Sequence, residues 1–122
     1  MELRKEIEIT PIGKLNRLEV EVEHDKGGYN FYDGSTRRKG IICRVRPLSR
    51  IGGLNSIIID GKTEHMGFYV FLVPCDRKSP KKLEKVADVI LPMTEKIGEM
   101  FVKGEYRAIA DMMLSAVGEL NL

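Results

Sequence analysis

The densest group of residues that could bind a charged ligand is the stretch RRKGIICRVRPLSR, residues 37–50. It holds six basic residues and no acidic one, and no acidic residue lies between Asp33 and Asp60. Basic side chains at this density neutralise phosphates and release their counterions. Alternation along a strand beginning at Gly40 places Arg44 and Arg46 on one face. The pattern therefore indicates a basic sheet face suited to a nucleic-acid backbone.

Aromatic residues precede this stretch in the segment GGYNFYDG. If Tyr29 and Tyr32 lie beside the basic face, they can stack bases, which contributes about 1–3 kcal/mol per base. A basic groove with an aromatic platform is typical of single-stranded nucleic-acid binding. The same aromatics would equally serve as core, because the chain has no Trp and few other large side chains.

A second interpretation of the arginines needs no ligand. Glu19, Glu21 and Glu23 alternate with apolar residues and share one face of a strand. Placed opposite Arg44 and Arg46, they would form a cross-strand charge ladder. Such pairs contribute little when exposed and carry no function. The sequence leaves the two interpretations open.

A second basic cluster, from Arg77 to Lys85, opens the expected first helix. Lysines at a helix start oppose the macrodipole, which favours negative charge there. A bound phosphate would gain from both the free N–H groups and the lysines, although lysine is also an ordinary solubilising residue. The predicted nucleic-acid-binding residues are Arg37, Arg38, Lys39, Arg44, Arg46, Arg50, Tyr29, Tyr32, Lys78, Lys81 and Lys82.

Residues for catalysis or metal binding are sparse. His24 and His65 have no carboxylate at a spacing that would indicate a catalytic pair. Cys43 and Cys75 form no cluster of metal ligands. Cys43 alternates with apolar residues and is expected to be a buried thiol, whereas Cys75 precedes a basic loop. We therefore expect a non-enzymatic protein with no cofactor and no metal.

Period-two patterns predict an antiparallel sheet of about five or six strands over residues 4–74. Residues 6–9 and 18–23 alternate apolar with acidic side chains, and residues 29–32 and 40–46 form further strands, the latter closed by Pro47. Ile57–Ile59 followed by Asp60 and Gly61 indicates a hairpin, with a returning strand over residues 64–73.

The returning strand is apolar on both faces, with residues 66, 68, 70 and 72 on one side and Tyr69, Phe71 and Val73 on the other. Two-sided apolar strands are usually covered on both faces, and helices in a chain of this size cover only one face well. The sequence therefore favours a homo-oligomer with Tyr69, Phe71 and Val73 at the interface, and closure of the sheet into a barrel is the alternative that would also bury this face.

The last third of the chain has helical periodicity. Ser79-Pro80 is a cap followed by a first-turn proline, and the apolar stripe continues over residues 80–102. Pro92 lies inside this stripe and should kink or split the helix. A second helix is expected over residues 105–117, with Gly118 at its end. Both helices should pack on one face of the sheet.

The 122 residues, with a net charge of +2, fit a single α+β domain spanning residues 1–122. The N-terminus has no apolar signal segment and no run reaches membrane-span length, so a cytoplasmic protein without membrane contact is expected. An antiparallel sheet followed by helix, over roughly residues 16–101, resembles the layout of Whirly and Pur-type single-stranded nucleic-acid binders. That resemblance implies a dimer or larger assembly with nucleic acid on the concave sheet face.

The favoured function is thus single-stranded nucleic-acid binding through a basic sheet face. In that case the arginines should form one patch separate from the strand glutamates. The alternative is a small protein-interaction or inhibitor module of a mobile-element or phage-like kind, binding a protein partner or a nucleotide-like ligand between subunits.

Overall fold

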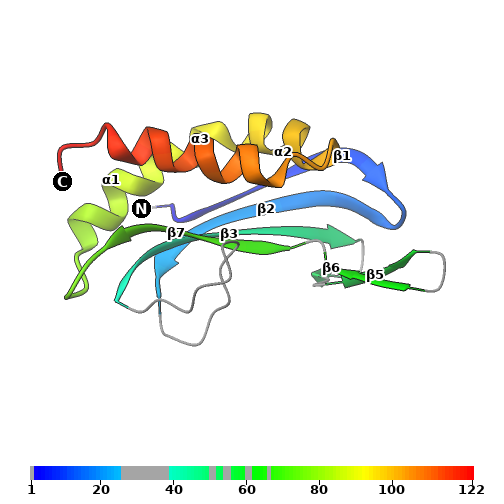
Figure 1. Ribbon diagram of the computed structural model, residues 1–122, viewed down its shortest axis with the longest axis horizontal. Coiled ribbons are helices and arrows are strands. Elements are labelled where there is room, and N and C mark those ends of the chain that lie inside the picture. The colour runs from blue at the N-terminus through cyan, green and yellow to red at the C-terminus, as the bar shows by residue number, and fades with distance from the viewer. Residues whose placement is uncertain (1, 26–38, 50–51, 54–55, 60–61, 66) are drawn as a thin grey trace.

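The protein has an antiparallel sheet followed by C-terminal helices, which confirms the α+β class (Figure 1). The computed structural model describes residues 2–25, 39–49, 52–53, 56–59, 62–65 and 67–122, and it describes residues 52–53, 56–59 and 62–65 by their backbone alone. The elements are β1 (Arg4–Ile12), β2 (Leu15–His24), β3 (Gly40–Ser49), β4 (Gly52–Gly53), β5 (Ser56–Ile59), β6 (Lys62–His65), β7 (Phe68–Pro74), α1 (Pro80–Ile90), the 3-10 helix η1 (Leu91–Met93), α2 (Thr94–Val102) and α3 (Tyr106–Gly118).

The main sheet has the order β1-β2-β3, and β3 then pairs along its other side with β7 and with the two-residue β4. All of these pairings are antiparallel. β5 and β6 form a separate hairpin, as the Ile57–Ile59 pattern predicts. The expected returning strand is therefore two strands, β6 and β7, which belong to different sheets. The predicted strand at residues 29–32 lies outside the described residues.

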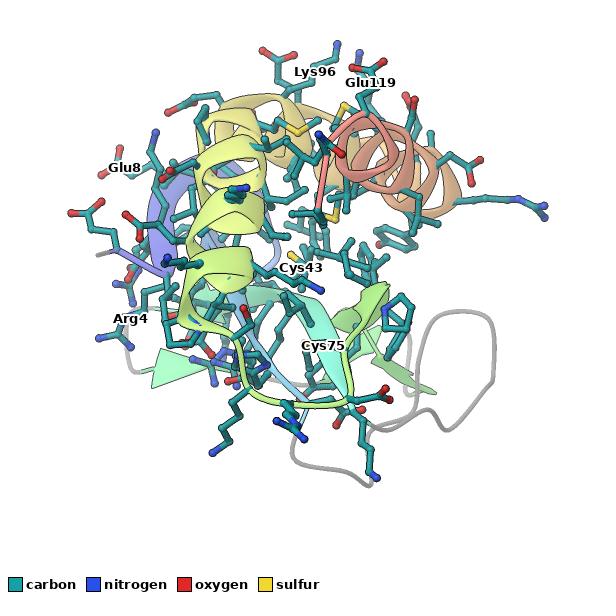
Figure 2. All side chains as sticks on the ribbon, turned by 90° about the vertical axis from the view of Figure 1, so that its left-hand side faces the viewer. Arg4, Glu8, Cys43, Cys75, Lys96 and Glu119 are labelled. Atoms are coloured by element: carbon teal, nitrogen blue, oxygen red, sulfur yellow. The ribbon has the colours of Figure 1, made fainter. Side chains whose placement is uncertain are left out.

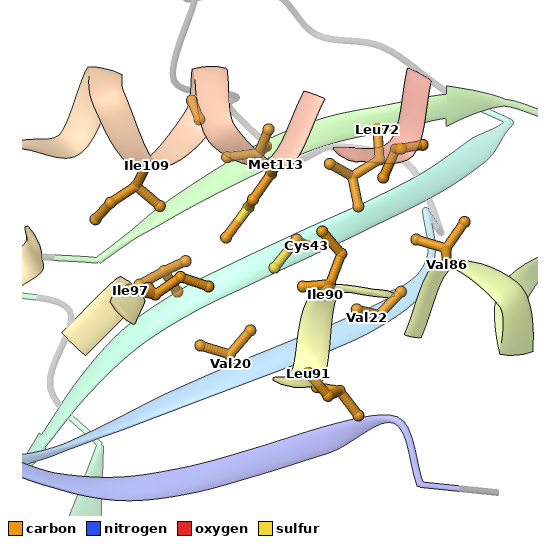
Figure 3. Packing of buried hydrophobic residues seen from close by; sticks show 14 of the residues in the cluster. Val20, Val22, Cys43, Leu72, Val86, Ile90, Leu91, Ile97, Ile109 and Met113 are labelled. Carbon is orange, nitrogen blue, oxygen red and sulfur yellow. The ribbon is translucent and has the colours of Figure 1, made fainter. Parts of the chain in front are cut away.

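Alternation along β2 and β3 produces the core. Leu18, Val20 and Val22 on β2 face the helices together with Cys43 and Val45 on β3, and all five are fully buried. Figure 3 shows Val20, Val22 and Cys43 of this layer facing Ile90, Ile97, Ile109 and Met113 from the helices. The opposite face of the same strands carries the charged residues.

β3 does not end at Pro47 but continues to Ser49. Gly40 O accepts from Asp25 N at 2.8 Å, so even-numbered residues of β3 direct their backbone groups to β2 and odd-numbered ones to the other side. On that side β7 pairs as far as Val45 and β4 begins at Leu48. Pro47 lies in the gap between them, where a missing N–H costs no ladder hydrogen bond.

β7 contains an irregularity that changes which face one residue occupies. The register with β3 shifts between Ile41 and Ile42, and Val73 then packs against the helix-side core with Leu72. The expectation that Val73 shares a face with Tyr69 and Phe71 is therefore wrong. A bulge of this kind places two successive side chains on one side of a sheet.

Helices cover one face of the sheet, as predicted (Figure 1). Ser79 caps α1, its hydroxyl accepting from Lys82 N at 3.4 Å. Pro92 splits the expected helix over residues 80–102 into α1, η1 and α2, so the described residues contain three α-helices in place of the two expected. None of the helices in the described part of the chain is long and apolar enough to cross a membrane.

Candidate nucleic-acid interface

The arginines of β3 are paired with the glutamates of β2. Glu19 lies opposite Arg46, and Glu21 lies opposite Arg44. One carboxylate oxygen of Glu19 accepts from Arg44 Nη2 at 3.0 Å and from Arg46 Nη2 at 3.1 Å. Glu21 Oε1 lies 3.0 Å from Arg44 Nη2. The expectation that these arginines lie apart from the strand glutamates is therefore wrong, and the cross-strand ladder is present.

The charged side chains of this ladder are largely buried. The Glu19 side chain is only 7% exposed, and those of Arg44 and Arg46 are 23% and 28% exposed. Although burial opposes the charged form of Arg44, the carboxylates of Glu21 and Glu19 and a side-chain hydrogen bond with Tyr69 raise the pKa of Arg44. Arg44 is thus permanently cationic and engaged with three neighbours.

These side chains balance one another electrostatically, since two carboxylates face two guanidiniums. A phosphate at Arg44 or Arg46 would compete with Glu19, whose carboxylate would lose partners inside the protein if it were displaced. The Phe71 ring lies over Gly40, because a methyl group added at Gly40 would lie 2.4 Å from it. The middle of this sheet face is therefore an internal network rather than an open basic surface.

The structure brings other cations together at one end of the sheet. β3 begins where β7 ends, with Gly40 paired to Pro74, and Cys75 N donates to Lys39 O at 2.8 Å. This contact places Lys39 beside the segment that leads into α1. We call the set Lys39, Arg77, Lys78, Lys81 and Lys82 the basic corner.

Two hydrogen bonds at the end of β2 join it to the segments that form the basic corner. Ser79 N donates to His24 Nε2 at 3.2 Å, so the N-cap residue of α1 is tied to the last residue of β2. Asp25 N donates to Gly40 O at 2.8 Å, which joins β2 to the start of β3. Figure 2 views the molecule from this end, with α1 toward the reader and Cys75 on the connecting segment. His24 is thus a structural acceptor.

The basic corner is open to solvent. Lys39, Arg77, Lys78 and Lys81 are exposed and Lys82 is half-buried. None of the five forms an ion pair with any residue that the structure describes. Acidic residues of the same segments are Asp25, Asp76 and Glu84, against six basic residues once Lys85 is included. The described part of the corner therefore carries an excess of positive charge.

The predicted nucleic-acid-binding residues thus fall into three groups. Lys39, Lys78, Lys81 and Lys82 lie at the basic corner, whereas Arg44 and Arg46 belong to the charge ladder. The remaining ones lie outside the described residues: Arg37, Arg38, Arg50, Tyr29 and Tyr32.

Sequence reasoning treated the stretch at 37–50 and the cluster at 77–85 as two sites. Their meeting follows from the antiparallel pairing of β3 with β7, because the start of one strand adjoins the end of the other. Among the described residues, no group of three His, Cys, Asp or Glu side chains is placed to hold a metal.

Comparison with protein-family models finds no match, and comparisons with curated proteins and with solved structures find none either. The resemblance in layout to Whirly and Pur-type proteins therefore gains no support from them, and the functional argument depends on the site alone.

Proposed function

We propose that the protein is a non-enzymatic binding protein that contacts single-stranded nucleic acid through the basic corner. The observation that supports this most is the convergence of Lys39 with Arg77, Lys78, Lys81 and Lys82 at one end of the sheet. Unlike the arginines of the ladder, these cations are accessible and have no carboxylate partner to displace among the described residues. The proposed binding surface therefore lies at the end of the sheet, whereas the sequence hypothesis put it on the middle of the sheet face.

The start of α1 is a favourable position for an anionic ligand. The first turn of α1 contains no acidic residue, while Lys81 and Lys82 add positive charge where the helix dipole is already positive. Without a ligand this arrangement is unfavourable, and a phosphate beside it relieves the repulsion. Lys39 and Lys78 lie on the flanking segments and can neutralise adjacent phosphates.

A single strand suits this surface better than a duplex. The corner is built from strand ends, a connecting segment and one helix start, and α1 lies flat on the sheet with Leu83, Val86, Ala87 and Ile90 buried. The described residues of the corner therefore present no free helix or two-stranded ribbon to enter a major groove. A flexible single strand can bend so that successive phosphates follow a small curved surface.

The test is fluorescence anisotropy with labelled single-stranded and double-stranded oligonucleotides at about 50 and 200 mM salt. The corner variant is Lys78→Ala/Lys81→Ala. Its matched control is Lys14→Ala/Lys103→Ala, which removes the same charge from exposed positions in the β1–β2 turn and after α2.

We expect single-strand binding that weakens with salt, falls about tenfold or more in the corner variant and stays within about twofold in the control. Equal loss in both variants would mean that net charge alone drives binding. Absence of binding at about 50 mM salt would overturn the proposal and point to a protein partner with an acidic surface.

A further inference from the structure

The first strand of the sheet has an edge that no described strand occupies. β1 is terminal in the strand order and pairs with β2 alone among the described elements. Leu3 O accepts from Val22 N at 2.7 Å, so the odd-numbered residues of β1 direct their backbone groups toward β2. Arg4, Glu6 and Glu8 therefore direct their N–H and C=O groups outward, where another strand can pair with them.

Basic and acidic side chains occupy different halves of this edge strand. β1 begins with Arg4 and Lys5 and continues with Glu6 and Glu8, so its first half is basic and its second half acidic. Arg4, Lys5 and Glu8 are exposed, as is the side chain of Glu6 at 39%. A strand with this order matches a second copy of itself when the two run antiparallel, because each basic half then lies against an acidic half.

We infer that the protein forms a homodimer in which β1 pairs antiparallel with β1 of a second copy, about a two-fold axis at Glu6. In this register Arg4 lies opposite Glu8 of the second copy, and the pair occurs twice by symmetry. The outward backbone groups of residues 4, 6 and 8 then all meet partners. The two sheets become one continuous sheet with both helical layers on the same side.

The centre and the end of the paired segment fit this register. Glu6 lies opposite Glu6 of the second copy at the axis, and this like-charge contact is offset because in each chain Arg17 Nη1 on β2 already pairs with Glu6 on β1. Beyond Glu8 the register of β1 shifts and Pro11 follows. Both features disfavour strand pairing, so pairing centred on Glu6 uses the regular part of β1.

The helix side of the edge offers a matching hollow. A space of about 400 Å³ lies between β1 and α2, lined by Ile7, Ile9, Glu95, Gly98 and Glu99 among others. In the proposed register Lys5 of the second copy lies opposite Ile7, on this side of the sheet. Its methylene stem can cover the apolar floor while its ammonium group meets Glu95 and Glu99.

The test is sedimentation equilibrium of the full chain over a range of protein concentrations. Arg4→Glu and Glu8→Arg each place like charges opposite one another, so each variant should raise the dimer dissociation constant at least about tenfold. An equimolar mixture of the two variants should form a heterodimer, because opposite charges then face each other again between positions 4 and 8 of the two chains. The double variant Arg4→Glu/Glu8→Arg should again be a homodimer.

Thermal unfolding of each variant verifies that it is folded, and Lys14→Glu is a control outside the edge that has the same change in net charge as Arg4→Glu. A wild-type chain that stays monomeric at every concentration would overturn the inference. So would a dimer that both single variants leave intact, since the contact would then lie elsewhere, for example at Tyr69 and Phe71. Neither outcome bears on nucleic-acid binding at the basic corner.

Discussion

Glu19 on β2 lies directly opposite Arg46 on β3, and Arg46 Nη2 is 3.1 Å from Glu19 Oε1. The same oxygen accepts from Arg44 at 3.0 Å, so one nearly buried carboxylate holds two guanidiniums. The ladder joins β2 to β3, and it gives both arginines a carboxylate partner within the protein.

Replacement of Glu19 should therefore be costly for the fold. Glu19→Gln keeps the shape but leaves two partly buried guanidiniums without this counter-charge. Breaking a fully buried pair costs roughly 3–5 kcal/mol. Because Arg44 and Arg46 are 23% and 28% exposed, we expect about 2–3 kcal/mol less stability, measured by urea unfolding at neutral pH.

The matched control for this loss is Glu99→Gln on α2. Glu99 Oε2 lies 3.8 Å from Lys96 Nζ, and the two side chains are 65% and 62% exposed. Exposed pairs contribute at most about 1 kcal/mol and often less. A Glu19→Gln loss no larger than that of the control would show that the ladder is dispensable.

Glu21 should have the opposite effect to Glu19 on the stability of the folded protein. Burial raises the pKa of Glu21 above its ordinary value of 4.5, Arg44 opposes this, and Glu23 and Glu19 add to the rise. The folded protein then holds this proton more tightly than the unfolded chain does. Glu21 accordingly lowers stability as the pH rises from about 4.5 through the folded pKa.

Glu21→Gln removes that loss. Relative to wild type, the variant should gain stability between about pH 4 and pH 7, measured as the difference in the free energy of unfolding at each pH. A relative stability that instead falls over this interval would mean that attraction to Arg44 outweighs burial.

The two thiols should differ in reactivity. Cys43 is fully buried, and burial together with the charge of Glu21 raises its pKa far above that of a free thiol. Cys75 is half-buried at the basic corner, and its Sγ lies 2.6 Å from Arg77 O. Maleimide should modify Cys75 alone in the native protein and both cysteines after denaturation, as read by mass spectrometry.

The same labelling reports on the proposed site. A bound oligonucleotide should slow the modification of Cys75, because the thiol lies on the segment between Lys39 and the basic residues that precede α1. Unchanged labelling at an oligonucleotide concentration that saturates anisotropy would place the binding surface elsewhere.

The sequence predicts the elements better than the contacts between them. Alternation in residues 6–9 and 18–23 predicts β1 and β2, because a half-buried strand requires period two. Pro92 predicts the split between α1 and α2, since a proline has no N–H to donate within a helix. These signals are local, and the structure agrees with them.

What the sequence does not predict depends on pairing between distant strands. The bulge that turns Val73 toward the core follows from the register of β7 against β3, and no residue type in FYVFLVP marks it. β3 continues through Pro47 because its partner changes there from β7 to β4. The basic corner likewise exists only once β3 and β7 are paired.

Lys39 has an unfavourable backbone conformation and is also part of the proposed binding site. Its φ is 61°, in the left-handed region that costs a residue with a side chain about 1–2 kcal/mol. Lys39→Gly should therefore leave the free energy of unfolding unchanged or raise it by up to about 1 kcal/mol, after the entropy cost of glycine is deducted.

The same substitution removes a cation from the basic corner, so oligonucleotide affinity should fall and the salt dependence should decrease by about one phosphate contact. Lys39→Ala should lose affinity equally while gaining no stability, since alanine keeps the left-handed cost. Opposite effects on stability and affinity in Lys39→Gly would indicate that the lysine is retained for its charge. Unchanged affinity in both variants would remove Lys39 from the site and leave its backbone conformation without a functional reason.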